Sequence, residues 1–376
     1  EKNWDAIDAG ATAFVKIDVP AAWANAEAVK VDVNLEGPAD AVAVAKNIMM
    51  PAGRMDGYSL PVSAFAGLED GQFPLGAAAY EKRGVAVSVP AWDAAKCIQC
   101  NQCSIVCPHA AIRPFLLTEE EAANAPFETK AGMKPYDNYK FRIQVSAMDC
   151  LSCGVCVETC IAKEKAIVMA PLKDNLKEAE NWDYCIALSH KDNPMAKANV
   201  KGSQFEQPLL EFSGACAGCG ETPYAKLLTQ LFGDRMQISN ATGCSSIWGG
   251  PAATSPYTTD NKGHGPAWAN SLFEDNAEHG FGMYLGQKAI RNRLIDNVKA
   301  IVDACKAPEN VLAAANAYLE TIDDGAKNTA AANALVEALK GFDCDCEAKK
   351  DILANSEYLS KKSVWIFGGD GWAYDI

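Results

Sequence analysis

The stretch CIQCNQCSIVCPHAAI, residues 97–112, contains four cysteines at the spacing C-x2-C-x2-C-x3-C-P. Three thiolates at this spacing wrap one face of a [4Fe–4S] cluster, and the fourth ligand of that cluster must come from elsewhere. The stretch CLSCGVCVETC, residues 150–160, repeats the four cysteines 53 positions later. The two stretches therefore predict a duplicated unit with two iron–sulfur sites.

The two cysteine runs are expected to complete each other, because in two-cluster arrangements the fourth cysteine of each run ligates the other cluster. We therefore predict one cluster on Cys97, Cys100, Cys103 and Cys160 and a second on Cys150, Cys153, Cys156 and Cys107. Pro108 follows Cys107 as the pattern requires, whereas Ile161 follows Cys160. Two structural zinc sites are the alternative, but zinc sites separate their C-x2-C pairs by a longer loop.

Strand-like segments flank both runs. GVAVSVPAWD (84–93) and FRIQVSAMD (141–149) precede them, and the apolar segments AAIRPF (110–115) and AIVMAPL (166–172) follow them. Alternating and short apolar runs of this kind are typical of strands. We expect each unit to be closed by a small β-hairpin.

Patterning divides the chain into three parts. Residues 1–72 carry no cysteine and are expected to be the end of an upstream domain plus a linker, and residues 73–189 contain the duplication. Residues 190–376 alternate helical and buried-strand signals with glycine turns, which favours α/β architecture. The predicted fold class is α/β and α+β, multidomain, with a two-cluster ferredoxin-like domain followed by an α/β domain.

Composition excludes several classes of function. The formal net charge of -14 argues against nucleic acid as a partner, since phosphate binding needs a basic face. No apolar run is long enough for a membrane span, and no secretory signal precedes the first domain, so we expect a cytoplasmic protein. Tight C-x2-C clusters among 15 cysteines favour metal ligation over disulfides.

A third, sparser set of cysteines follows. GACAGCGET contains Cys216 and Cys219, and ATGCSSIWGG contains Cys244, which gives three candidate ligands where a cubane needs four. The candidates for the fourth are Cys185, Cys305, Cys344, Cys346 or a cysteine beyond residue 376. Buried or free thiols are the alternative for this set.

Phosphate and magnesium signals lie in the last part of the chain. The segment SVWIFGGDGWAYDI (363–376) predicts a fully buried strand that runs into a glycine turn, with Asp370 between Gly369 and Gly371. Glycines let a diphosphate approach the backbone, and a carboxylate there can hold Mg2+. The helix predicted from Thr222, with that residue as N-cap, Pro223 in its first turn and Gly233 as its stop, offers free N–H groups to an anion. An ordinary turn is the alternative for G-D-G.

The three cysteine sets and G-D-G, in this order, resemble the pyruvate:ferredoxin (flavodoxin) oxidoreductases, within the 2-oxoacid:ferredoxin oxidoreductases. The resemblance covers nearly the whole chain. Its most specific parts are CIQCNQCSIVCP, CLSCGVCVETC, ACAGCGETPYAKLLTQLFGDRMQISNATGCSSIWGG, GPAWANSLFEDNAEHGFGMYLG and GGDGWAYDI.

The resemblance implies oxidative decarboxylation of pyruvate with coenzyme A to acetyl-CoA and CO2. It implies thiamine diphosphate with Mg2+, and three [4Fe–4S] clusters that feed ferredoxin or flavodoxin. Residues 190–376 would be the N-terminal, incomplete part of a thiamine diphosphate-binding domain. By the same resemblance, Cys216, Cys219 and Cys244 hold the cluster nearest thiamine, Glu221 and Cys244 border the cofactor, and Gly369, Asp370, Gly371 and Trp372 begin its diphosphate and Mg2+ site.

Several parts that the family requires lie outside this sequence. The fourth ligand of the third cluster and the remaining Mg2+ ligands are expected downstream, and the residues that activate thiamine and hold pyruvate are expected upstream. We therefore expect the chain to be a segment that works with the remaining segments of the same enzyme, in a homo-oligomer. No catalytic residue is assigned on this chain. The alternatives are the same chemistry on another 2-oxoacid and a pure iron–sulfur electron carrier.

Charge distribution predicts where an acidic electron acceptor would dock. Eight Lys or Arg residues balance eight Asp or Glu residues between Lys96 and Lys165, so this region is neutral within an acidic chain. Electrostatic steering favours such a face for an acidic partner. The basic residues predicted to contact it are Lys134, Lys140 and Arg142; a solvated charge run without a partner is the alternative. The four histidines show no ligand spacing, so we expect them to be solvated or packed.

Overall fold

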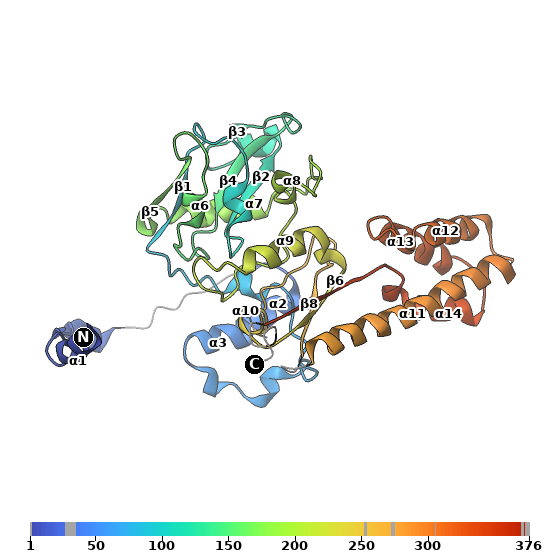
Figure 1. The fold of residues 1–376 in the computed structure, drawn as a ribbon, viewed down its shortest axis with the longest axis horizontal. Helices are drawn as coiled ribbons and strands as arrows, with labels where there is room; N and C mark the ends of the chain where they lie inside the picture. Colours follow the sequence, from blue (N-terminus) through green and yellow to red (C-terminus); the bar gives the residue numbers. More distant parts are fainter. Residues whose placement is uncertain are drawn as a thin grey trace. The chain divides into compact units, whose positions relative to one another are not determined.

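The structure is a computed structural model that describes residues 2–26, 35–251, 254–271, 275–304, 306–369 and 372. The chain divides into two compact units, Glu1–Glu36 and Gly37–Ile376. In the first unit, helix α1 (Lys2–Gly10; Figure 1) buries no side chain. Trp4 and Ile7 are largely exposed. Most helical stability comes from packing an apolar face, so α1 gains little from the described residues.

The second unit starts with a segment of short helices. Helix α2 (Ala39–Val44) buries only the small or aliphatic side chains Ala41 and Val44, and α3 (Met50–Gly53) has no buried residue. The chain then runs along the loop around Tyr257, whose carbonyl accepts from the Gly76 N–H at 2.7 Å. This segment is therefore packed on residues of the last part of the chain.

Two antiparallel sheets build the duplicated region. β1 (Ser88–Trp92) pairs with β5 (Ile167–Pro171), and β4 (Lys140–Val145) lies between β2 (Ile112–Leu117) and β3 (Lys130–Ala131). The four predicted strands are confirmed, but the prediction of a hairpin within each unit is wrong. The strand before each cysteine run pairs with the strand after the other run, so the two units exchange strands (Figure 1).

The strand exchange places the cysteine runs on a common core. Phe141 and Ile143 of β4 pack with Ile112 of β2, and Cys103 and Cys156 belong to the same cluster of buried side chains. Two one-turn helices follow the first cysteines of each run, α4 (Gln102–Ile105) and α6 (Val155–Glu158), and they pack against each other. The two runs are therefore held face to face rather than in separate units.

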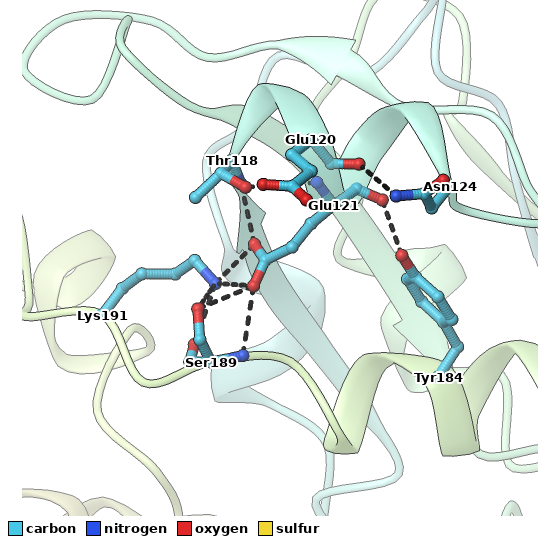
Figure 2. Close-up of polar contacts among 7 residues, drawn as sticks. All are labelled: Thr118, Glu120, Glu121, Asn124, Tyr184, Ser189 and Lys191. Atoms are coloured by element: carbon cyan, nitrogen blue, oxygen red, sulfur yellow. Dashed lines mark hydrogen bonds and ion pairs between the residues drawn. The ribbon is translucent and has the colours of Figure 1, made fainter.

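A polar network ties this region to the segment that leaves it. Helix α5 (Glu119–Ala123) begins with a capping box between Thr118 and Glu121, and α7 (Lys177–Ile186) leads to the segment before α8 (Val200–Ser203). Figure 2 shows the Glu121 carboxylate between Thr118, Ser189 and Lys191. It accepts hydrogen bonds from the Thr118 N–H at 2.8 Å, the Ser189 hydroxyl at 2.7 Å and Lys191 Nζ at 2.8 Å.

We expect Glu121→Gln to loosen residues 187–193. Burial raises the pKa of Glu121, but the bonds from Lys191, Ser189 and Thr118 outweigh it and lower the pKa to about 2. A carboxyl with a lowered pKa stabilises the fold fully above its unfolded pKa of about 4.5, and that stability is lost as the pH falls towards 2. Since Glu121 is partly exposed, we expect about 1–2 kcal/mol at pH 7.

Hydrogen–deuterium exchange of residues 187–193 measures this loss. The variant should exchange roughly tenfold faster than the parent at pH 7, and the ratio should fall towards one between about pH 4.5 and pH 2. Glu120→Gln is the matched control, because Glu120 is an exposed residue of the same helix. A ratio that does not change with pH would show that the ionised carboxylate does not anchor the segment.

A parallel sheet organises the last part of the chain, with β6 (Met236–Asn240) between β7 (Ala267–Asn270) and β8 (Ser363–Phe367). Helix α9 (Thr222–Phe232) precedes β6, and α10 (Cys244–Gly249) follows it (Figure 1). Met236 and Ile238 of β6 are buried with Ala225 of α9 and Trp248 of α10. The mixed α/β character predicted for this part is confirmed.

Two local predictions for this part need correction. Thr222 is the first residue of α9 rather than its N-cap, which is Glu221, and the buried Thr222 hydroxyl has no partner among the described residues. Strand β8 is partly exposed rather than fully buried, because it is an edge strand of the described sheet, with Ile366 43% exposed. The long helix over Asn276–Ala304 exposes Phe281 and Tyr284, so only its later part lies in a core.

A helical module lies between β7 and β8. It comprises α11 (Asn276–Ala304), α12 (Glu309–Glu320), α13 (Asn328–Lys340) and α14 (Glu347–Ala354) (Figure 1). Leu294 and Val298 of α11 pack with Val311, Leu335 and Ile352 in its core. Within the described part of the chain, no helix combines the length and hydropathy that a membrane crossing requires.

Candidate metal centres and cofactor site

The two cysteine runs adopt the same backbone conformation. Gln99 and Ser152 have φ of 56° and 59°, and Asn101 and Gly154 have φ of 61° and 76°. These left-handed residues lie 53 positions apart in each pair, and they turn the chain so that an N–H points at sulfur. Gln99 N–H donates to Cys97 Sγ and Ser152 N–H to Cys150 Sγ, both at 3.4 Å. The repeat in the sequence is therefore also a repeat of loop geometry.

The fourth cysteine of the first run lies with the first three of the second run. Cys107, Cys150, Cys153 and Cys156 line one pocket, together with apolar residues that include Ile112 and Val145. Burial, followed by the charges of Cys107, Cys150 and Cys153, raises the pKa of Cys156 to about 12. Such a set holds its thiols protonated unless a cation compensates them, which is what a metal centre does.

In the first set, the first three cysteines lie close together. Burial, followed by the charges of Cys156, Cys97 and Cys100, raises the pKa of Cys103 well above its usual range. Cys160 ends α6 as Cys107 ends α4, because each donates its N–H to the carbonyl three residues earlier at 3.2 Å. Cys160 in the second unit is therefore equivalent to Cys107 in the first unit, and Cys107 lies with the cysteines of the other run.

The sulfur atoms do not converge on one point. Among the residues described, no group of three or more His, Cys, Asp or Glu side chains is arranged to hold a metal ion. A single zinc needs its sulfurs about 2.3 Å from one centre, whereas a cubane distributes four ligands over four irons. The backbone of the cysteine loops and the pocket that Cys107 shares with the second run both fit [4Fe–4S] ligation.

The third cysteine pair adjoins the second set. Glu221 N–H donates to Cys219 Sγ at 3.4 Å, which is the same contact that the other two loops make. Gly218 has φ of 73°, and a Cβ there would lie 3.7 Å from the Cβ of Cys153. His109, which lines the pocket of the second set, shares a hydrogen bond with the Cys216 carbonyl at 3.1 Å.

The remaining cysteine candidates are spread over the fold. Cys244 is exposed at the start of α10, at the carboxyl end of β6. Cys185 is buried, and the charges around it are those of Arg142 and Glu178. Cys344 packs on the core of the helical module, and Cys305 lies outside the described residues. The charges around Cys185 include none from Cys216 or Cys219.

Two parallel strands end side by side where the cofactor is predicted. The Ala241 N–H after β6 donates to the Phe367 carbonyl at the end of β8 at 2.8 Å. A Cβ on Gly369 would lie 2.3 Å from the Thr242 carbonyl oxygen, so only glycine fits there. Trp372 packs where a Cβ on Gly368 would project. Ligands of open α/β sheets bind at such strand ends. Asp370 and Gly371 lie outside the described residues.

Buried polar atoms at this edge have unused hydrogen-bonding capacity. Asn240 Oδ1, Ser245 Oγ and Thr222 Oγ1 are buried and have no partner among the described residues. Each such atom costs about 1–3 kcal/mol if it is left unsatisfied. Glu221 is oriented by Trp248, whose indole N–H donates to its carboxylate at 3.1 Å. The glycine cradle and these polar atoms fit a diphosphate cofactor.

A polar network behind this edge was not predicted from the sequence. Ser239 Oγ donates to Asn276 Oδ1 at 2.8 Å and shares a hydrogen bond with His279 Nδ1 at 2.7 Å. Asn276 Nδ2 donates to the Phe367 carbonyl at 3.0 Å. These contacts tie β6, α11 and the end of β8 together. Isolated polar residues carry no spacing signal, so only the fold could reveal them.

The predicted docking residues divide into two kinds. Arg142 is buried, donates to Gln144 at 2.6 Å and Glu178 at 3.0 Å, and stacks over Phe127. Its assignment to a docking face is therefore wrong, because its charge is used inside the domain. Lys140 forms an ion pair with Glu119 at 2.9 Å, and Lys134 is exposed before Pro135.

The fold and the cysteine loops identify the class of the protein: an iron–sulfur protein with a ferredoxin-like part and a mixed α/β part. A family described as a 4Fe-4S dicluster domain matches residues 96–163, and one described as a domain of unknown function matches residues 32–86. Over its whole length, the chain corresponds to a segment of the pyruvate:ferredoxin (flavodoxin) oxidoreductases, as its sequence predicted.

Three relatives illustrate this similarity. The chain is 52% identical to the pyruvate-flavodoxin oxidoreductase of Enterobacter agglomerans over 99% of its length and 32% of the relative's. It is 48% identical to the pyruvate:ferredoxin oxidoreductase of Moorella thermoacetica over 100% of its length and 32% of the relative's. It is 44% identical to the mitochondrial pyruvate dehydrogenase [NADP(+)] of Euglena gracilis over 96% of its length and 20% of the relative's. The chain thus spans a third or less of these relatives.

Proposed function

We propose that this chain is the electron-transferring and cofactor-binding segment of an enzyme that oxidatively decarboxylates pyruvate with coenzyme A. The products are acetyl-CoA and CO2, and the electrons leave through three [4Fe–4S] clusters. The three relatives all carry pyruvate in their names, which supports this substrate over another 2-oxoacid. Cytoplasmic location and a homo-oligomeric assembly with the remaining segments are parts of the proposal.

One observation carries the proposal: the crossed arrangement of the cysteines. The pocket that Cys107 shares with the second run supports one cluster on Cys107, Cys150, Cys153 and Cys156. The equivalent position of Cys160 supports the other on Cys97, Cys100, Cys103 and Cys160. The third cluster is assigned to Cys216, Cys219 and Cys244 with a fourth ligand outside this set. Four cysteines within eleven residues disfavour zinc, which separates its C-x2-C pairs by a longer loop.

The contacts between the loops support an order for the centres. The Cys216–Cys219 loop adjoins Cys153 of the second set, and α6, which carries Cys156 of the second set, packs against α4, which carries Cys103 of the first. Electrons would therefore pass from the third set to the second and then to the first. This arrangement disfavours a pure carrier, because the third set adjoins the cradle at the strand ends.

When bound, thiamine diphosphate supplies the carbanion and electron sink of the reaction, and Mg2+ neutralises its phosphates. On this chain, the glycines at 368–369 and the strand end at Thr242 would hold the diphosphate close to the backbone. Glu221, oriented by Trp248, would border the cofactor together with Cys244. Asp370, Gly371 and Trp372 would complete the part of the diphosphate and Mg2+ site that this chain carries.

The acceptor is proposed to be ferredoxin or flavodoxin. Two of the three relatives carry one of these acceptors in their names, whereas the third names NADP(+). The same segment therefore occurs with different acceptors, so other segments must contribute to their choice.

Asp370→Ala in the full-length enzyme tests the cofactor site. Loss of a Mg2+ ligand should weaken thiamine diphosphate binding at least as much as the roughly 10- to 100-fold that outer partners of metal sites contribute. Calorimetric titration with thiamine diphosphate and Mg2+ measures the affinity, and iron content should not change. Asp303→Ala, at an exposed position of α11, is the control. Unchanged affinity in Asp370→Ala would make G-D-G an ordinary turn.

A further inference from the structure

Lys226 is a buried lysine that the proposed function does not use. It lies on α9, is 1% exposed, and directs its ammonium group at the end of α4. Its Nζ donates to the carbonyls of Ser104, Ile105 and Cys107, the last two at 3.2 Å. All three ammonium protons are therefore used by the backbone of the first cysteine run, 119 to 122 residues away in sequence.

This cation has no carboxylate partner. Among the described residues, no Asp or Glu forms an ion pair with Lys226, and the nearby Arg113 adds a like charge. Burying an uncompensated ammonium group is expensive, so such a group is expected to face negative charge in the working protein. The thiols whose charges act on it are Cys107 and Cys103.

Cys103 and Cys107 belong to different proposed clusters, which gives Lys226 an unusual position. One ammonium group on the α4 turn faces a ligand of the first set and a ligand of the second set. Reduction adds a negative charge to a cluster, and a fixed cation nearby stabilises the reduced form most effectively where water is excluded. Net charge and hydrogen bonding around the sulfurs are known determinants of cluster potentials.

We propose that Lys226 is a positioning and tuning residue whose fixed charge raises the reduction potentials of both ferredoxin-type clusters. This inference rests on the proposed function, since it requires the two clusters. Helix α9 begins at the cap residue Glu221, beside the Cys216–Cys219 loop, and carries Lys226 one turn further on. The cofactor-side part of the chain therefore sets the driving force for electrons that leave it.

The test is an EPR-monitored redox titration of the full-length enzyme with Lys226→Gln and Lys226→Met. Gln keeps amide donors for the carbonyls but removes the charge, and Met removes both. We expect the reduction equilibrium of both clusters to fall by about tenfold in Lys226→Gln, which is about 59 mV for a one-electron couple. Iron content should match the parent.

Lys197→Met is the matched control. Lys197 is an exposed lysine that donates to the Leu231 carbonyl of the same helix at 3.2 Å, so its loss removes a similar bond. Both potentials should stay at the parent values in this variant. Unchanged potentials in Lys226→Gln with iron retained would overturn the proposal, and so would loss of both clusters in Lys226→Gln and Lys226→Met, because the role would then be structural. A parent enzyme without cluster signals would instead contradict the proposed function.

Discussion

Replacing Cys107 with Ala is expected to remove the cluster that belongs to the second cysteine run and to leave the cluster of its own run in place. Cys107 shares a pocket with Cys150, Cys153 and Cys156, whereas Cys103, four residues earlier, lies with Cys97 and Cys100. A [4Fe–4S] cluster needs four ligands, so the loss of one should abolish or convert that cluster in nearly every molecule. Cluster-resolved EPR of the dithionite-reduced full-length enzyme measures the outcome.

The reciprocal variant makes this prediction sharper. Cys160→Ala should affect the cluster of Cys97, Cys100 and Cys103 and spare the other. Cys185→Ala is the control for these two signals, because Cys185 is buried in the same domain beside Arg142 and Glu178 and belongs to neither cysteine run, so both signals should persist. If Cys107→Ala removed only the signal of the first run, each run would ligate its own cluster and the crossed assignment would be wrong.

Gly369→Ala is expected to abolish thiamine diphosphate binding. The new Cβ would lie 2.3 Å from the Thr242 carbonyl oxygen, and a backbone atom cannot move aside as a flexible side chain can. The end of β8 would have to separate from the end of β6, which opens the cradle in which the diphosphate is proposed to bind. We expect an affinity loss of at least roughly 100-fold by calorimetric titration, with iron content retained.

Gly282→Ala is the control for this substitution. Gly282 lies on an exposed position of α11, and no atom lies within 4 Å of an added Cβ. Alanine in a helix interior is more stable than glycine by roughly 1 kcal/mol, so this variant should bind thiamine diphosphate normally. If Gly369→Ala also bound it with parental affinity, the strand ends would not form the cofactor cradle.

The cysteine runs were predictable because their chemistry is local. Residues 97–107 and 150–160 contain the cysteine spacing, and the strands predicted on either side of these runs are present in the structure. The strand pairing was not predictable in the same way. Hairpin closure within a unit and exchange between units use identical strands, and only the packing of both units on one core around Phe141 separates the two.

Arg142 illustrates that the charge of a residue in the sequence does not tell whether its side chain is exposed. Between Lys96 and Lys165 the sequence offers eight positive residues, and nothing in the chain distinguishes a solvated one from a buried one. In the fold, Arg142 lies against Phe127 and Glu178, and its charge is neutralised inside the domain. Lys226 is the opposite case, since the sequence analysis did not single it out and the fold places its charge at the first cysteine run.

At the proposed cofactor site, the sequence indicated the residues that carry a motif and missed those that support it. Glycines and cysteines at fixed spacing pointed to Gly369 and Cys244. Asn276 and His279, by contrast, bind Ser239 across elements that are distant in sequence. Such contacts require a known topology, in this case the parallel order β7-β6-β8 and the start of α11.

The central claim is that the clusters of this chain receive electrons from pyruvate. The most direct measurement is EPR of the full-length enzyme, prepared without oxygen and mixed with pyruvate and coenzyme A but no electron acceptor. Our account predicts signals of reduced [4Fe–4S] clusters that match those obtained with dithionite. Clusters that dithionite reduces but pyruvate leaves oxidised would contradict it, and reduction by a different 2-oxoacid alone would keep the electron path but change the substrate.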